Sequence, residues 1–122
     1  MERTSPKRVL FVDQNDVARS TVPRLLAIYG FDVTAVATTE NALGEVKADN
    51  FDVLLCAVPL QSSSTIELIS EMNTNQPRCI CFALVEDEAE ELRTALMGRA
   101  VCIRRPISIE NLVKAIWEKL SV

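Results

Sequence analysis

The chain has 122 residues, of which 48% are hydrophobic and 25% are charged, and this composition fits one globular domain with its own core. The net charge of −4 argues against a nucleic-acid-binding surface, and no apolar run is long enough to span a membrane. The absence of histidine excludes phosphohistidine relays, histidine-based catalysis and most zinc sites. We expect a single cytoplasmic domain over residues 1–122, with a flexible tail over residues 1–6 and no secretion signal.

Mostly apolar runs of about six residues alternate with segments of helical periodicity in the first half of the chain. They predict three strands, over residues 8–13, 32–37 and 51–57. Gly30 is expected to end the first helix, and Thr38 or Thr39 to begin the second. Pro23 lies inside the first helix and predicts a kink or a local loosening there.

The second half of the chain repeats this alternation. It predicts two more strands, over residues 78–84 and 100–104. A capping-box pattern at residues 64–67 indicates the start of a third helix. The acidic run over residues 86–91 opens a fourth helix over residues 86–97, which Gly98 ends, and Ser108 caps the last helix.

The order of elements predicts the fold class. Continuously apolar strands between helices indicate a three-layer α/β sandwich with a parallel five-stranded sheet, in the flavodoxin-like order 2-1-3-4-5. The ligand crevice of such a sheet lies beyond the carboxyl ends of the strands, at the switch point between the first and third strands. The candidate site residues at those ends are Asp13, Gln14, Ala57, Ala83, Arg104 and Arg105.

Four segments resemble the receiver domain of two-component response regulators, a CheY-like fold. They are RVLFVDQND, ATTENAL, FDVLLCAV and RRPISIENL. Their spacing agrees with that family without gaps from Phe51 to Pro106. The resemblance covers almost the whole chain and implies a signal-transduction module related to phosphorelays.

The chemistry of the family needs five side chains. An acidic pair holds Mg²⁺, an Asp accepts the phosphoryl group, and a Thr or Ser and a Lys bind its oxygens. In this chain these positions are occupied, in that order, by Asp13, Gln14, Ala57, Ala83 and Arg105. The resemblance therefore implies a degenerate pseudo-receiver that is not phosphorylated at the family site and is not an enzyme. No cofactor is expected, and Mg²⁺ binding is expected to be weak or absent, because Asp13 is the one matched carboxylate.

Other expectations concern the surroundings of this site. Arg105 is expected to pair with Asp13, Glu86 or Asp87 and to fill the space that metal and phosphate would take. The resemblance also implies a cis peptide bond before Pro106. Asp52 and Asp16 are weak substitute nucleophiles: Asp52 is expected at the opposite end of the sheet and Asp16 in the first turn of a helix. Ser62 to Ser64 are interpreted as a loop and helix cap.

The expected partner is another protein rather than a nucleic acid or a membrane. In receivers, the usual partner face combines the fourth helix, the fifth strand and the last helix. The positions that we place on or beside this face are Cys102, Val113 and Trp117. Cys102 replaces the aromatic residue that reports phosphorylation in many receivers. A signalling kinase, an output domain and a second copy of the chain are all open as partners.

A sensor is the alternative function. The two alanines at positions 57 and 83, with Cys81 nearby, would form an apolar pocket in the vacated crevice, and Arg105 would anchor an anion there. A redox role for the four cysteines belongs to the same alternative, although their positions in apolar runs favour small core residues in a reducing compartment. Cys79-Ile80-Cys81 also lacks the two-residue spacer that is common in zinc sites.

Overall fold

The computed structural model describes residues 6–57, 62–85 and 94–120, with residues 62 and 63 described by their backbone alone. Its strands are β1 (Lys7–Val12), β2 (Phe31–Val36), β3 (Val53–Ala57), β4 (Ile80–Val85) and β5 (Val101–Arg104). All pairings are parallel, and the order across the sheet is β2-β1-β3-β4-β5. The predicted fold class and strand order are confirmed.

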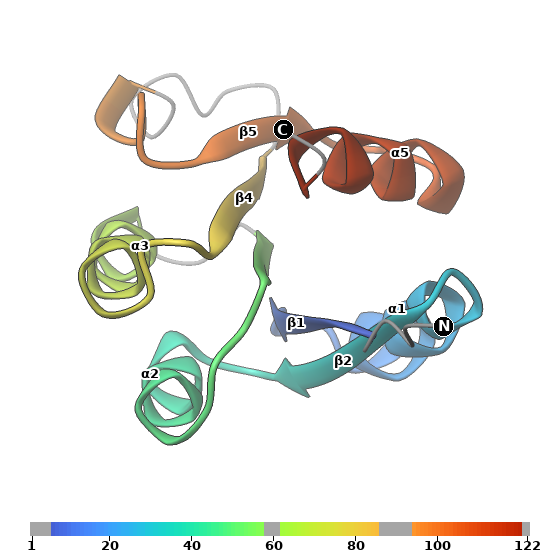
Figure 1. Ribbon diagram of the computed structural model, residues 1–122, viewed down its shortest axis with the longest axis horizontal. Coiled ribbons are helices and arrows are strands. Elements are labelled where there is room, and N and C mark those ends of the chain that lie inside the picture. The colour runs from blue at the N-terminus through green and yellow to red at the C-terminus, as the bar shows by residue number, and fades with distance from the viewer. Residues whose placement is uncertain (1–5, 58–61, 86–93, 121–122) are drawn as a thin grey trace, which may run out of the picture.

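Helices cover both faces of this sheet (Figure 1). They are α1 (Asp16–Ile28), α2 (Thr39–Ala48), α3 (Ser62–Asn75) and α5 (Ile109–Leu120). In Figure 1, α1 and α5 lie on one side of the strands and α2 and α3 on the other. Most of the predicted fourth helix, and the acidic run that opens it, lie outside the described residues, as does most of the predicted N-terminal tail. Within the described ranges, every helix is too short or too polar to cross a membrane.

The core consists of two apolar clusters, one on each face of the sheet. On β1, Val9 and Phe11 belong to the cluster beneath α1 and α5, whereas Leu10 and Val12 belong to the cluster beneath α2 and α3. All four side chains are at most 2% exposed. A strand that is buried on both faces needs a continuously apolar sequence, which explains why the strands do not alternate between apolar and polar residues.

Local signals place several element ends as predicted. Gly30 follows α1 with a φ of 91°, a conformation that favours glycine. The hydroxyl oxygen of Thr38 accepts a hydrogen bond from the Asn41 N–H at 3.1 Å, and that of Ser108 accepts one from the Asn111 N–H at 3.1 Å. The expected cis peptide bond before Pro106 is also present.

The start of α3 is a correction. The helix begins at Ser62, so Ser64 lies within its first turn and does not cap it from outside. Any of three successive serines suits a helix start, and their sequence does not choose between them. The buried side chains of Thr65 and Leu68 belong to the face that packs on the sheet, and this packing fixes the position of the helix.

Candidate functional site

The site predicted at the carboxyl edge of the sheet is assembled by strand register. Val12 pairs with Cys56, so Asp13 and Ala57 follow as neighbours where β1 and β3 end. Ala57 pairs with Leu84 on β4. The N–H of Arg105 donates a hydrogen bond to the Val85 oxygen at 2.8 Å, which brings Arg105 beside the end of β4.

The two alanines of the site are core residues. Ala57 is 3% exposed and belongs to the cluster beneath α1 and α5, whereas Ala83 is 0% exposed and belongs to the cluster on the opposite face. Neither lines either of the two cavities around Asp13 and Arg105 described below. The predicted apolar pocket between the alanines is therefore not part of those cavities.

Cys56 precedes Ala57 and is the sulfur nucleophile nearest to it in the chain. Its side chain is completely buried, and burial raises the pKa of its thiol to about 12. The nucleophile of cysteine chemistry is the thiolate, which this environment suppresses at neutral pH. Cys56 therefore does not supply a nucleophile beside Ala57.

Asp13 is held by the turn that leads into α1. Its Oδ1 accepts a hydrogen bond from the Asn15 N–H at 2.9 Å, and Asn15 in turn caps α1 by accepting from the Ala18 N–H at 2.8 Å. Arg19 donates to the backbone oxygens of Asp13 and Gln14 at 3.0 and 2.9 Å. Sequence reasoning missed Asn15, although an Asn directly before a helix is a common capping signal.

Asp16 lies in the first turn of α1, where it was expected. It forms an ion pair with Arg19, three residues further along the same helix. The Asp16 carboxylate is therefore part of the local structure of the helix start, and it does not line the cavities beside Asp13.

Two cavities meet at Asp13 and Arg105. The larger, of about 650 Å³, lies over the start of α1 and is also lined by Gln14 and Thr21. The smaller, of about 250 Å³, extends towards Pro106 between α1 and α5. The structure thus brings Asp13, Gln14 and Arg105 together, as predicted. It adds the exposed side of α1, which no sequence motif indicated.

The expected ion pair of Arg105 is only partly tested. Asp13 and Arg105 line the same cavities, yet the ion pairs among the described residues do not include one between them. The other expected partners, Glu86 and Asp87, lie outside the described residues. Pairing of Arg105 with one of them stays a prediction.

Comparison of the chain with known protein families identifies the family to which it belongs. The response regulator receiver domain matches residues 9–117. The chain belongs to this family. The match begins within β1 and ends within α5, and it includes the carboxyl edge with Asp13 and Ala57.

Relatives of this receiver domain are longer proteins. The cyclic di-GMP phosphodiesterase of Thermotoga maritima is 28% identical over 106 residues, and the two-component response regulator ORR27 of Oryza sativa subsp. japonica is 28% identical over 113 residues. These matches cover 85% and 90% of this chain, but the chain spans only 28% and 18% of those proteins. A solved CheY-like receiver domain protein from Methanospirillum hungatei has a TM-score of 0.87 at 22% identity, with 96% of this chain and 95% of that chain covered.

The three residues predicted on or beside the partner face do not form one surface in this receiver domain. Val113 is 7% exposed and belongs to the cluster beneath α1 and α5, whereas Cys102 packs against the cluster on the opposite face. The Trp117 ring lies 5.2 Å from the Phe31 ring, at the edge of the α1 side, and is 37% exposed. Cys102 therefore faces the opposite side of the sheet from Val113 and Trp117, which lie four residues apart on one face of α5.

Cys81 also lies away from the site. It pairs with Leu54 near the start of β4, two residues before Ala83, and it lines a separate hollow with Cys79 and Gly98. The prediction that Cys81 belongs to the vacated crevice is therefore wrong. It failed because proximity in the sequence along a strand does not place two side chains at the same end of the sheet.

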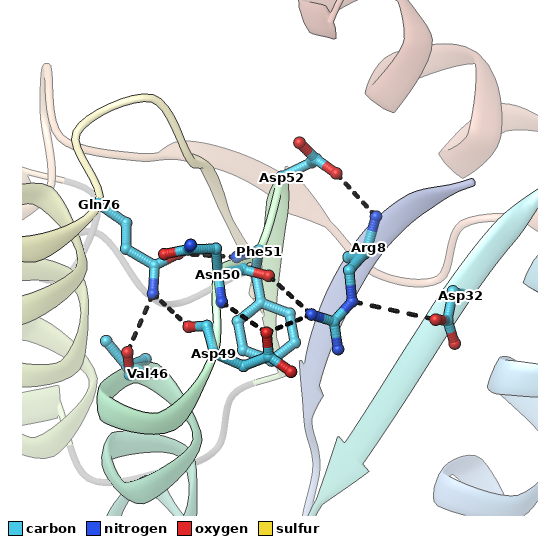
Figure 2. Close-up of polar contacts among 8 residues, drawn as sticks. All are labelled: Arg8, Asp32, Val46, Asp49, Asn50, Phe51, Asp52 and Gln76. Carbon is cyan, nitrogen blue, oxygen red and sulfur yellow. Dashed lines mark hydrogen bonds and ion pairs between the residues drawn. The ribbon is translucent and has the colours of Figure 1, made fainter. Parts of the chain in front are cut away.

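The opposite edge of the sheet holds a polar network that sequence reasoning did not find (Figure 2). The Arg8 guanidinium contacts Asp49 at 2.5 Å and lies 5.1 Å from the centre of the Phe51 ring. The hydrogen bond from Arg8 lowers the pKa of Asp49. Asp52 accepts a hydrogen bond from the Arg8 N–H at 2.8 Å, which places it at this edge, as predicted, far from Ala57.

Proposed function

We propose that this receiver domain is a protein-interaction module of a signalling pathway that works without phosphorylation at the family site. The observation that carries the proposal is Ala57, a methyl group buried at the end of β3, where the family resemblance calls for the phosphoacceptor Asp. A methyl group has no atom that can attack phosphorus. The module is accordingly constitutive, or is switched by an event other than phosphoryl transfer.

The charges around Asp13 support this proposal. In the described part of the chain, Asp13 is the one carboxylate that lines the two cavities, and its Oδ1 is already an acceptor for the Asn15 N–H. Mg²⁺ demands octahedral oxygen coordination and is usually held by one or two carboxylates together with phosphate oxygens. The guanidinium of Arg105 adds a positive charge to the same space. These residues do not fit a magnesium site, and we expect no cofactor and no enzymatic activity.

The partner we propose is a protein. The segment shared with this chain is 28% and 18% of the two curated relatives, so the receiver domain occurs there joined to further sequence. We expect this chain likewise to act on another module, either a signalling kinase, an output domain or a second copy of itself. The exposed part of Trp117 is a plausible contact in such a complex, because aromatic side chains often anchor interfaces.

Acetyl phosphate and beryllofluoride should leave the protein unchanged. Both are added with Mg²⁺ to the purified chain, and the expected result is no mass increase and no shift of backbone amide resonances, since position 57 has no carboxylate. Titration with Mg²⁺ alone should show no submillimolar binding by calorimetry. A stoichiometric phosphoryl adduct, or a beryllofluoride shift centred on residues beside β3, would overturn the proposed function.

A second candidate function is a small-molecule sensor. The observation in its favour is the depression of about 650 Å³ beside Asp13 and Arg105, within the size range of ligand sites. A thermal-shift screen of metabolites, nucleotides and quinones tests it. A hit whose stabilisation disappears in the Arg105→Ala variant and persists in the exposed control Lys114→Ala would favour the sensor, and a screen without such a hit would favour the protein-interaction module.

A further inference from the structure

Cys79 and Cys81 form a pair of thiols on one face of the sheet. Both belong to the cluster beneath α2 and α3, whereas Ile80 between them packs against the opposite cluster. Cys79 lies in the bend directly before β4 and Cys81 lies within β4, and both side chains pack on the same face of the sheet. Hydrogen bonding from the Cys79 thiol lowers the pKa of Cys81, whereas the pKa of Cys79 is raised. The two thiols therefore influence one another, and each also has an acceptor of its own: Cys79 Sγ lies 3.9 Å from the Ile80 oxygen and Cys81 Sγ lies 4.0 Å from Asn73 Oδ1.

A hollow opens onto this pair. Its volume is about 290 Å³, and both cysteines line it together with Gly98, Arg99 and Lys119. The cysteines themselves are only 6% and 3% exposed, so a large reagent has little access to them. A small ion entering the hollow meets both cysteine residues, and two cationic residues also line it.

The donor set limits which ion fits. In the part of the chain that the structure describes, no third Cys, His, Asp or Glu completes a metal-binding group around the pair. Structural zinc almost always takes four protein ligands, so a pair of thiols is a poor zinc site. Two thiolates are a complete ligand set for a soft monovalent ion in linear coordination, and soft sulfur ligands favour Cu(I).

A disulfide between Cys79 and Cys81 fits the structure less well than a metal ion bound by both sulfurs. A disulfide would bring the two sulfurs to about 2.05 Å with a restricted dihedral angle, across the single residue Ile80. An ion between the sulfurs bridges a longer span than a direct S–S bond, and it leaves the strand in place. The hydrogen bond from the Ile80 N–H to the Asp52 oxygen, at 2.9 Å, then stays intact.

We propose that Cys79 and Cys81 bind one soft monovalent metal ion of the Cu(I) class. Two metal–sulfur bonds form while two thiol protons pass to water, and the resulting bis-thiolate complex carries one net negative charge. Arg99 and Lys119 offset this charge from the wall of the hollow. The site lies at the amino-terminal edge of the sheet, so it is independent of the proposed loss of phosphorylation at Ala57.

Anaerobic titration of the reduced chain with Cu(I), against the chromogenic chelator bicinchoninate, tests the site. The native chain should withdraw one Cu(I) from the chelator. Cys79→Ser and Cys81→Ser should each lose this stoichiometric uptake. Cys56→Ser is the matched control, because Cys56 is a buried cysteine on the same face that does not line the hollow, and it should bind like the native chain.

Thermal melting with one equivalent of Ag(I) gives a second measurement that also reports folding. The native melting temperature should rise, and that of a folded Cys81→Ala variant should not. Uptake that survives both serine substitutions, or that disappears with Cys56→Ser, would refute the site. Zn²⁺ binding to the pair with equal strength would refute the proposed ion class.

Discussion

Four substitutions at the carboxyl edge of the sheet should create a chain that takes up a phosphoryl group. They are Gln14→Asp, Ala57→Asp, Ala83→Thr and Arg105→Lys. With Mg²⁺ and acetyl phosphate, the introduced carboxylate at position 57 should attack phosphorus, with acetate leaving, and intact-mass measurement should detect one phosphoryl group per chain. The physical reason is that the variant supplies the nucleophile, the second acid, the hydroxyl and the point charge on a backbone that already has the receiver fold.

Two controls separate the contribution of the acceptor at position 57 from that of the other three substitutions. The triple variant without Ala57→Asp should stay unlabelled, because it has no acceptor. Ala57→Asp alone should be labelled about 100-fold more slowly than the quadruple variant, since it lacks the second acid and the groups that bind the phosphoryl oxygens. Circular dichroism checks that each variant folds. A folded quadruple variant that takes up no phosphate would mean that the missing side chains do not by themselves explain an inactive site.

Gln76→Ala should lower the free energy of unfolding by about 3 kcal/mol, because it leaves buried backbone groups without hydrogen-bond partners. Gln76 is 9% exposed, and its Oε1 accepts from the Phe51 N–H at 2.7 Å. Its Nε2 donates to the backbone oxygens of Val46 and Asp49 at 3.0 and 2.7 Å, as Figure 2 shows. One side chain therefore joins the ends of α2 and α3 to the start of β3. Urea unfolding, read as the free energy of unfolding in water, measures the loss.

Asn75→Ala is the matched control for this prediction. Asn75 precedes Gln76 and is exposed, and its side chain donates to Glu71 on the same helix at 2.7 Å. Removing an exposed hydrogen bond should change the free energy of unfolding by no more than about 0.5 kcal/mol. Equal effects of the two substitutions would show that the Gln76 network does not stabilise the fold as the buried contacts indicate.

The sequence predicted the sheet because burial of every strand on both faces leaves a strong pattern. Helix ends at Gly30, Thr38 and Ser108 were also predicted, since their conformations and caps depend on neighbouring residues. The start of β3 was placed two residues early. Phe51 looks like part of the apolar run, but its N–H bonds to the Gln76 side chain, and the strand begins at Val53.

Part of the candidate site was also predicted from the sequence, because several of its residues directly follow predicted strands. Asp13, Gln14 and Arg105 follow strands directly, so the parallel order of the sheet brings them to one edge. The wall that α1 contributes through Thr21 was missed, because it depends on how the helix lies on the sheet. The partner-face prediction also depended on which way side chains point. Cys102 and Val113 face opposite sides of the sheet.

By itself, the sequence determined the fold class, the strand order and the residues available at each strand end, because periodicity, caps and motif spacing are local properties of the chain. Only the tertiary structure decided which side chains meet. It buried Ala57 and Ala83 in separate clusters, placed Cys79 and Cys81 at a shared hollow, and closed the network around Gln76. Such contacts join residues that are far apart in the chain or that alternate across a strand, so they follow from packing and register and leave no continuous pattern in the sequence.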